Sequence, residues 1–259
     1  MVKQKDLKKH SLDISAKIEN AVSGEEYFSS PYQHIILDNL LENRFIESIF
    51  KAFPKLNDSA WEHTFDDGIE VKSRTNWTSE FDIPDKIIDI IRIFNSSPVL
   101  NAIGSRLKIP KLIPDPYFTG GGLNITPKDG LLDVHVDGNY HDATGLNRRV
   151  NLLLYLNKNW KPDWGGELGI YKNEGKILHT SIAPIFNRCV IFDTHDKSYH
   201  GLPNPINFPK KESRKSIILY YYTHAPRPKG QILVDKPHSA LWRSKKFTDK
   251  KGKKVRNFT

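Results

Sequence analysis

Two kinds of hydrophobic spacing divide the chain into a part with helices and a part rich in β-strands. Residues 39–53 carry apolar side chains at helical spacing, and this pattern ends before Pro54. A second amphipathic pattern covers residues 85–94 after Pro84, and a further short helical piece begins at residues 97–98. We expect these helices to pack against a sheet.

From about residue 116 to 225 the pattern changes to short β runs separated by turn residues. The runs lie at 131–136, 149–156, 167–171, 190–193 and 214–223, and an earlier one lies at 34–38. No long helix separates them, so the spacing favours an antiparallel sandwich or barrel over a parallel sheet built from βαβ units. The sequence therefore predicts a mainly β fold with flanking α-helices.

Length and composition favour one catalytic domain. The chain has 259 residues, and its hydrophobic and charged fractions of 38% and 27% are typical of globular proteins. Weak apolar periodicity and frequent charges predict a flexible polar leader over residues 1–24. We expect a single domain at 25–243, with its β core at about 116–226, followed by a basic tail at 244–259.

Charge and hydropathy say little about partners. The formal net charge is +9, and part of it lies in the tail at 244–259. That tail could contact nucleic acid or an acidic surface, but its few aromatic residues favour a solvated tail instead. The first residues lack the apolar core of a secretory signal, and no apolar run could span a bilayer. We therefore expect a cytoplasmic location, with the lone Cys189 as a small buried residue.

The candidate chemistry begins at His135 and Asp137, near the end of a predicted strand. Residues two apart on a strand point to the same face, so these two side chains are neighbours. A second histidine, His200, follows a later β run and completes the set of two histidines and one carboxylate that leaves three positions open on a ferrous ion. His195 is the strongest alternative third ligand, but it lacks the Gly-Leu-Pro continuation and lies in a polar stretch.

A carboxylate-binding group is predicted on the last β run. Arg214 and Ser216 share one face of that run, and the guanidinium fork of an arginine meets a carboxylate with two parallel hydrogen bonds. The run at 149–156 places Asn151 and Tyr155 opposite a fully apolar face, as expected for a pocket wall. Each residue alone has an ordinary structural alternative, but their order along the chain favours one site.

In these residues the sequence resembles the 2-oxoglutarate and iron(II) dependent oxygenases of the prolyl-hydroxylase-like group. The matching motifs are His135-Val136-Asp137, Arg148 to Asn157, Trp164-Gly165-Gly166-Glu167-Leu168, His200-Gly201 and Arg214-Lys215-Ser216. The resemblance implies a double-stranded β-helix, a jelly-roll, cupin-like barrel with the metal at its mouth. It also implies that Arg214 binds the distal carboxylate of 2-oxoglutarate with help from Tyr155. Ser216 and Asn151 are further candidates for co-substrate binding.

The resemblance further implies an enzyme that uses Fe(II), 2-oxoglutarate as co-substrate and dioxygen, with ascorbate as an optional aid. It would hydroxylate an unactivated C–H bond while 2-oxoglutarate is decarboxylated to succinate. Because Asp137 is a carboxylate, the position that a halide would need is filled, which favours hydroxylation over halogenation. The substrate stays open between a protein residue of prolyl type and a small metabolite. A catalytically silent jelly-roll binding protein is the alternative. Asn124 departs from the family, whose members often carry His or a nearby Tyr there.

Overall fold

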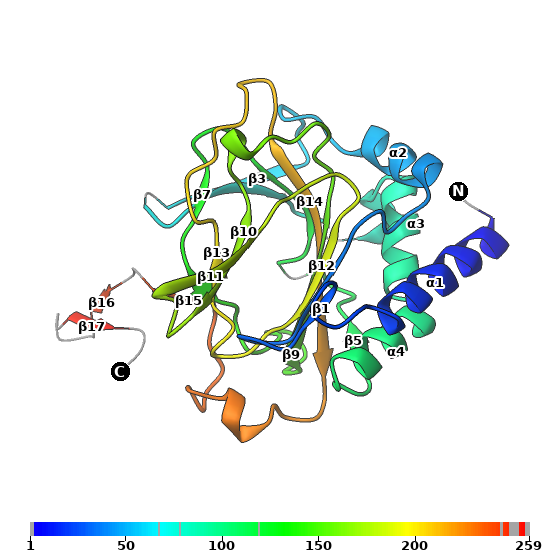
Figure 1. The fold of residues 1–259 in the computed structure, drawn as a ribbon. Coiled ribbons are helices and arrows are strands. Elements are labelled where there is room, and N and C mark those ends of the chain that lie inside the picture. The colour runs from blue at the N-terminus through cyan, green and yellow to red at the C-terminus, as the bar shows by residue number, and fades with distance from the viewer. Residues whose placement is uncertain are drawn as a thin grey trace.

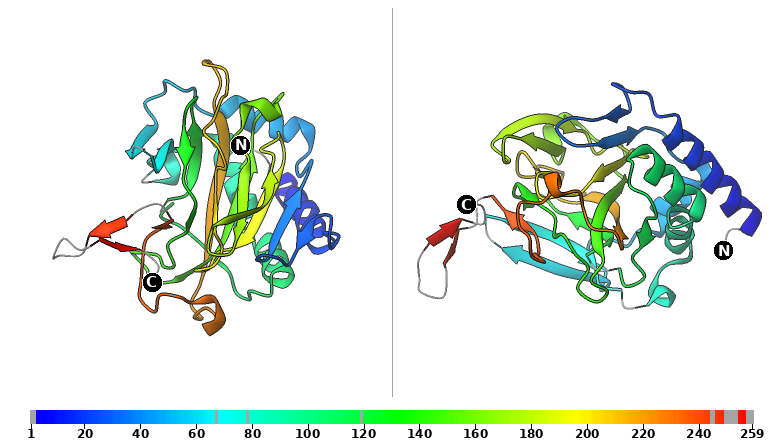
Figure 2. Two further views of the ribbon diagram at one scale, coloured as in Figure 1. Left: turned by 60° about the vertical axis from the view of Figure 1, so that its left-hand side comes forward. Right: turned by 90° about the horizontal axis from the view of Figure 1, so that it is seen from below.

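The computed structural model is built around two antiparallel β-sheets, with helices packed against one of them (Figure 1). It describes residues 3–66, 68–77, 79–118, 120–243, 246–248 and 254–256. The four α-helices are α1 (Gln4–Glu19), α2 (Asn43–Ala52), α3 (Asp85–Phe94) and α4 (Ser97–Arg106). They gather on one side of the strands, as Figure 2 shows from two further directions. The helices expected from the sequence are thus confirmed as α2, α3 and α4.

The helix α1 corrects the expectation of a flexible leader over residues 1–24. Ser11, Ile14 and Ile18 lie on one face of this helix and are buried. The hydroxyl groups of Ser11 and Ser96 are 2.6 Å apart and tie α1 to the start of α4. A buried face that includes serine side chains gives only a weak hydrophobic period, which is why the sequence pattern missed this helix.

The larger sheet has ten strands. Its order is β1-β2-β12-β9-β14-β6-β4-β3, with β5 paired to β14 and β7 paired to β4. The strands are β1 (Tyr27–Phe28), β2 (His34–Leu37), β3 (Trp61–Asp66), β4 (Glu70–Thr75), β5 (Ile113–Pro114), β6 (Gly122–Thr126), β7 (Leu131–Leu132), β9 (Asn147–Tyr155), β12 (Cys189–Asp193) and β14 (Arg214–Thr223).

The smaller sheet has five strands in the order β11-β10-β13-β8-β15. They are β8 (His135–Val136), β10 (Leu168–Lys172), β11 (Ile177–Ile182), β13 (His200–Gly201) and β15 (Leu241–Trp242). A separate ladder joins β16 (Lys246–Thr248) to β17 (Lys254–Arg256), and short 3-10 helices lie at Glu80–Asp82, Pro162–Trp164 and Lys229–Gln231. All ladders between these strands are antiparallel, as the sequence predicted.

The predicted β run at 131–136 is wrong as a single strand, whereas β2, β9, β10, β12 and β14 confirm the other predicted runs. The first half of the predicted run at 131–136 is β7, which pairs with β4 of the larger sheet. Its second half is β8, which pairs with β13 and β15 of the smaller sheet. The chain crosses from one sheet to the other at Asp133, whose N–H donates to the carbonyl of Ile69 at 2.7 Å.

Alternation along β9 separates two hydrophobic cores. Leu152 and Leu154 belong to the core that the larger sheet shares with the helices. Leu153 and Tyr155 point the other way, into a smaller core between the two sheets. The helices therefore cover one face of the larger sheet, and the opposite face is directed toward the smaller sheet.

Several expectations concern features away from these sheets. Cys189 is a buried free cysteine, as expected. No helix in the described ranges has the length and apolar character needed to cross a membrane. Most of the predicted basic tail at 244–259, with its suggested nucleic-acid contact, lies outside the described residues. The division into a single domain at 25–243 with a core at 116–226 stays a prediction.

Candidate functional site

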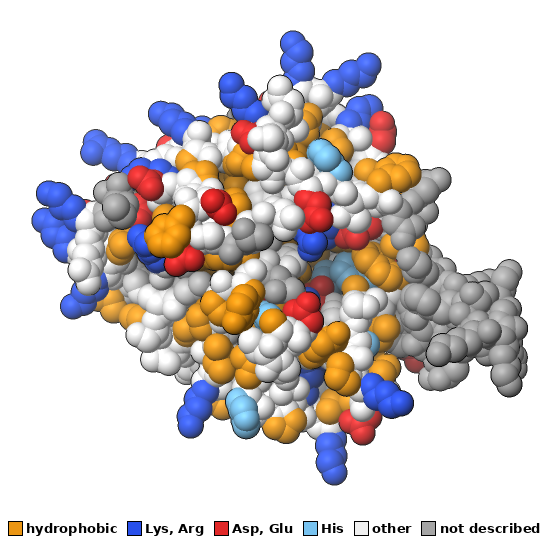
Figure 3. All heavy atoms as spheres, turned by 180° about the vertical axis from the view of Figure 1, so that it is seen from behind, with side chains coloured by type: hydrophobic (Ala, Val, Ile, Leu, Met, Phe, Trp, Pro, Cys, Tyr) orange, Lys and Arg blue, Asp and Glu red, His pale blue; other side chains and the backbone are white. Residues whose placement is uncertain are grey.

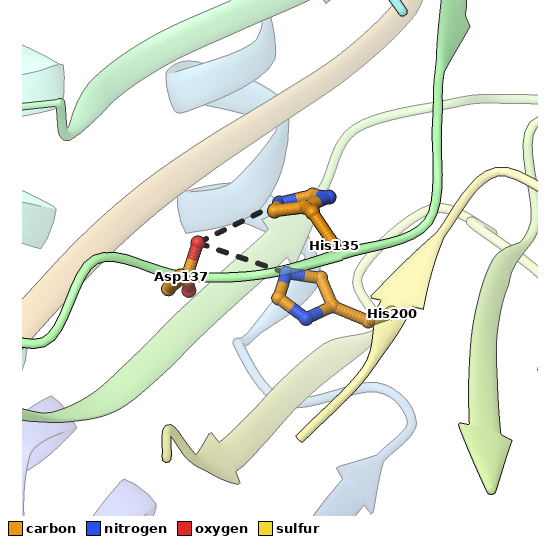
Figure 4. Close-up of side chains that lie close together, drawn as sticks. All are labelled: His135, Asp137 and His200. Atoms are coloured by element: carbon orange, nitrogen blue, oxygen red, sulfur yellow. Dashed lines mark ion pairs between the residues drawn. The ribbon is translucent and has the colours of Figure 1, made fainter. Parts of the chain in front are cut away.

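The three predicted metal ligands meet between the two sheets. His135 and His200 are directly opposite each other in the ladder between β8 and β13, and their ring centroids are 4.4 Å apart. Oδ1 of Asp137 lies 3.7 Å from Nε2 of His135 and 3.8 Å from Nε2 of His200 (Figure 4). One donor atom from each residue lies within 4.8 Å of the others, and all three residues are buried.

Backbone carbonyl groups determine which nitrogen each histidine can offer to a metal. Nδ1 of His135 lies 2.8 Å from the carbonyl oxygen of Asp133, and Nδ1 of His200 lies 2.9 Å from that of Ser198. A carbonyl oxygen can only accept, so each Nδ1 carries the hydrogen and donates it. In the neutral imidazole, each Nε2 then keeps a free lone pair, which is the state that metal-binding histidines need.

The electrostatics of the cluster favour a neutral imidazole at His200 and an anionic carboxylate at Asp137. Burial, followed by the neighbouring charge of His135, lowers the pKa of His200 to about 4. Burial raises the pKa of Asp137, but His200, His135 and Arg148 together outweigh it and lower this pKa well below its usual range. The cluster can therefore offer two Nε2 atoms and one anionic oxygen, a donor set that suits Fe(II) with three positions left open.

A cavity of about 320 Å³ reaches these three residues. Strands of both sheets contribute to its wall, together with the segment that leads into β15. Figure 3 shows a hollow on this face of the molecule, with histidine side chains inside it and hydrophobic and acidic side chains around it. The three predicted metal ligands are thus buried in the protein yet accessible to a small ligand from the surface.

Arg214 lies in the wall of this cavity and is held by two hydrogen bonds. Its Nε donates to the carbonyl of Gly166 at 2.6 Å, and its Nη2 donates to the hydroxyl of Tyr155 at 3.2 Å. Three of the five N–H donors of the guanidinium are left for a ligand. Gly166 has φ +83°, and a Cβ there would lie 3.1 Å from Cδ of Arg214. A side chain at Gly166 would therefore displace the arginine.

The other predicted co-substrate residues differ in their positions. Asn151 lines the cavity, but its Nδ2 donates to Oδ2 of Asp137 at 3.1 Å. Ser216 lies opposite Tyr155 and Asn124 on the neighbouring strands, and its buried hydroxyl has no hydrogen-bond partner among the described residues. Tyr155 reaches the cavity through its bond to Arg214. Asn124 is part of the cavity wall, with its Nδ2 3.4 Å from the carbonyl of Gly122.

The competing histidines lie elsewhere. His195 is buried, and its Nδ1 accepts from the backbone N–H of Lys197 at 3.1 Å. His141 is also buried, and its Nε2 lies 2.9 Å from Oδ1 of Asp115. Across the described ranges, the group of metal-binding side chains that comes together is His135, Asp137 and His200.

Sequence reasoning missed several residues of the cavity wall. Arg148 packs its guanidinium over the ring of Tyr220, with 4.1 Å between the guanidinium carbon and the ring centroid. Glu70 and Lys72 of β4 also line the cavity, and their alternation with less polar neighbours was a period-two signal for this strand. Trp242 pairs with β8 and its ring lies 4.5 Å from that of His135, but a two-residue strand has no period to detect.

The chain that follows β14 returns to the site across the loop between β12 and β13. We call residues 226–242 the return segment. Oδ2 of Asp196 accepts the backbone N–H groups of residues 233–234 at 2.7 and 3.0 Å. Oδ1 of Asp196 accepts from Nη1 of Arg227 at 3.0 Å and lies 3.2 Å from Nε2 of His238. One carboxylate thus holds the segment that carries His238 and Trp242 to the cavity.

Comparison with known proteins finds similarity to 2-oxoglutarate oxygenases over part of the chain. Residues 121–222 match the family described as the 2OG-Fe(II) oxygenase superfamily. Prolyl hydroxylase EGLN3 of Mus musculus is 30% identical over 112 residues, which are 41% of this chain and 43% of that protein. Prolyl 3-hydroxylase OGFOD1 of Mus musculus is 30% identical over 86 residues, which are 32% of this chain and 15% of that protein. The chain therefore spans less than half the length of these curated relatives in its matches.

Solved structures show the same fold. A prolyl hydroxylase from Trichoplax adhaerens, in complex with a peptide fragment of the hypoxia inducible factor oxygen degradation domain, superimposes with a TM-score of 0.53 and 18% identity. That match covers 86% of this chain and 94% of the other. A prolyl-4-hydroxylase from Pseudomonas putida gives a TM-score of 0.53 and 14% identity, over 82% of this chain and 99% of the other.

Proposed function

We propose that this chain is an iron(II)- and 2-oxoglutarate-dependent dioxygenase. Two similarities support this: residues 121–222 match the 2OG-Fe(II) oxygenase superfamily, and part of the chain resembles the prolyl hydroxylases. The proposed substrate is a residue of a protein, of prolyl type. The observation that carries the proposal is the buried group of His135, Asp137 and His200 at the inner end of a cavity whose wall also contains Arg214.

The geometry of the site supports a role for each of these residues. His135, Asp137 and His200 would hold the ferrous ion, with both histidines already in the tautomer that offers Nε2. The bound iron supplies the oxygen chemistry that couples decarboxylation of 2-oxoglutarate to succinate with hydroxylation of a C–H bond. Arg214 would bind the distal carboxylate of 2-oxoglutarate, because Gly166 and Tyr155 fix its guanidinium before any ligand arrives.

Two observations support a protein residue as the substrate. The curated relatives named above, which match part of the chain, are prolyl hydroxylases. The cavity also meets the surface in a hollow, so that a side chain presented by another molecule can reach the metal ligands (Figure 3). A small metabolite is the competing substrate class, and the assay below includes it.

The sheets support a jelly-roll barrel as the frame for this chemistry. Two antiparallel sheets enclose the site, and the larger one contributes Asn151 and Arg214 while the smaller one contributes His135 and His200. Two antiparallel sheets that face each other are the arrangement expected of a double-stranded β-helix.

The proposal is tested with purified protein under anaerobic conditions. Addition of Fe(II) and 2-oxoglutarate should produce a weak visible charge-transfer band, and exposure to air should release succinate. Asp137→Ala is the matched control and should give neither signal. If the folded wild-type protein gives neither the absorption band nor succinate, the proposal is contradicted and a catalytically silent jelly-roll binding protein is favoured.

A second assay separates the substrate classes. Proline-containing peptides and a metabolite library are compared for their ability to increase succinate release. A peptide that increases release and gains one oxygen atom, detected by mass spectrometry, supports the protein substrate. Stimulation by a metabolite alone would overturn that part of the proposal while leaving the reaction class in place.

A further inference from the structure

We infer that Asn151 is a positioning residue for the metal-binding carboxylate of Asp137, and that it selects which of the two carboxylate oxygens faces the metal. This inference rests on the proposed function, because it assigns a role toward the ion that the three ligands would hold. It also moves Asn151 away from the predicted role in co-substrate binding.

The first step is the rigidity of the position. Asn151 lies in the middle of β9, where its backbone is paired with Phe192 of β12 on one side and Tyr220 of β14 on the other. Only 4% of its surface is exposed. Both neighbouring strands therefore hold the Cα of Asn151, and its side chain can only point toward the smaller sheet or toward the helices.

The second step is the contact across the two sheets. Nδ2 of Asn151 donates to Oδ2 of Asp137 at 3.1 Å. Asp137 directly follows β8 of the smaller sheet, whereas β9 is a central strand of the larger one. An ionised carboxylate only accepts hydrogen bonds, so the amide nitrogen of Asn151 must be the atom that faces it. The amide thus fixes the rotation of the carboxylate from the opposite sheet.

The two carboxylate oxygens of Asp137 make different contacts. Oδ1 is the atom that lies 3.7 and 3.8 Å from the two histidine Nε2 atoms. Oδ2 is turned to Asn151. A carboxylate held in this way offers a single oxygen to the ion, which keeps three positions open for co-substrate and dioxygen. A carboxylate free to turn could bind through both oxygens and fill one of those positions.

The oxygen atom of the Asn151 amide lacks a hydrogen-bond donor among the described residues. This atom, Oδ1, is buried. A buried acceptor without a partner destabilises the folded state, and a leucine of similar shape would avoid that penalty. Packing alone therefore does not explain an asparagine here, whereas the bond to Asp137 does.

The test measures metal binding without co-substrate, using Co(II), whose visible absorption depends on coordination number. Asn151→Leu and Asn151→Ala both remove the donor, and we expect each to raise the dissociation constant for Co(II) by about 10- to 100-fold and to change the visible spectrum. Asn124→Leu is the matched control, because Asn124 lines the same cavity but donates toward Gly122. We expect Co(II) affinity in this control to equal that of the wild type.

A stability measurement separates positioning from a structural role. Metal-free Asn151→Leu should unfold within a few degrees of the wild type, because the loss of the hydrogen bond to Asp137 opposes the removal of the unmet acceptor. If this variant does not fold, as judged by far-UV circular dichroism, Asn151→Ala decides the question. Wild-type Co(II) affinity in a folded Asn151 variant would overturn the inference alone. Failure of the wild type to bind Co(II) any better than Asp137→Ala would instead contradict the proposed function.

Discussion

Replacement of Arg214 by lysine tests the proposed binding of 2-oxoglutarate most directly. Lysine keeps the positive charge but loses the rigid fork, including the N–H groups that donate to Gly166 and Tyr155. A hydrogen bond to a charged group contributes about 1.5–3 kcal/mol. Loss of one such bond to the distal carboxylate therefore predicts a KM for 2-oxoglutarate raised by about 10- to 150-fold, at about 1.4 kcal/mol per tenfold change.

The assay is succinate release at varied 2-oxoglutarate, with Co(II) affinity measured in parallel. Tyr155→Phe is a milder second variant, because it keeps Arg214 and removes only the hydroxyl that accepts from Nη2 of Arg214. Loss of one ordinary hydrogen bond of about 0.5–1.5 kcal/mol predicts a KM raised by about 2- to 13-fold. An unchanged KM in a folded Arg214→Lys variant would refute the assignment. Reduced Co(II) affinity in that variant would show that the arginine acts through the metal site.

Three further predictions concern the surroundings of the site. His200→Ala should abolish Co(II) binding, whereas His195→Ala should keep it, as measured by titration with Co(II). The reverse result would show that His195, not His200, is the third ligand. Burial raises the pKa of Asp193 to about 6, so the folded state binds the extra proton between about pH 4 and 6 and loses that stabilisation as the pH rises through 6. In the wild type the free energy of unfolding should therefore fall by at most about 3 kcal/mol between pH 4.5 and 7, as measured by urea unfolding, and Asp193→Asn should remove this decrease. The same decrease in both proteins would contradict the prediction. Asp196→Asn should speed hydrogen exchange of the backbone N–H groups at 233–234 by about tenfold or more, and unchanged exchange would show that other contacts hold the return segment.

The sequence predicted the elements whose side chains follow a regular period. The helices α2 and α3 have strong amphipathic spacing, and β9 and β14 are strands of nine and ten residues that contain long runs of β-forming apolar and aromatic side chains. The set of His135, Asp137 and His200 was also predictable, because residue types, order along the chain and strand context limit the choices for a metal site. In each case the information lies within a few neighbouring residues or within a recognisable motif.

The features that the sequence did not predict depend on contacts between distant segments. The bond between Asn151 and Asp137 joins two sheets, and neither residue carries a local sign of it. Trp242 reaches His135 through a strand of two residues, which is too short for any period. The helix α1 packs through serine and isoleucine side chains together, so its hydrophobic pattern is weak. Long-range packing, which decides all three, cannot be read from local spacing.

The ladder between β8 and β13 has a consequence for how the chain can vary. His135 and His200 occupy one directly paired position, and a shift of a single residue in either strand would turn one imidazole to the opposite face. Natural variants should therefore keep a constant number of residues at 133–137 and at 198–201, whereas this pairing does not depend on the length of the loops at 138–146 and 202–213. An active homologue with one residue inserted inside either short stretch would have to hold its metal by another arrangement.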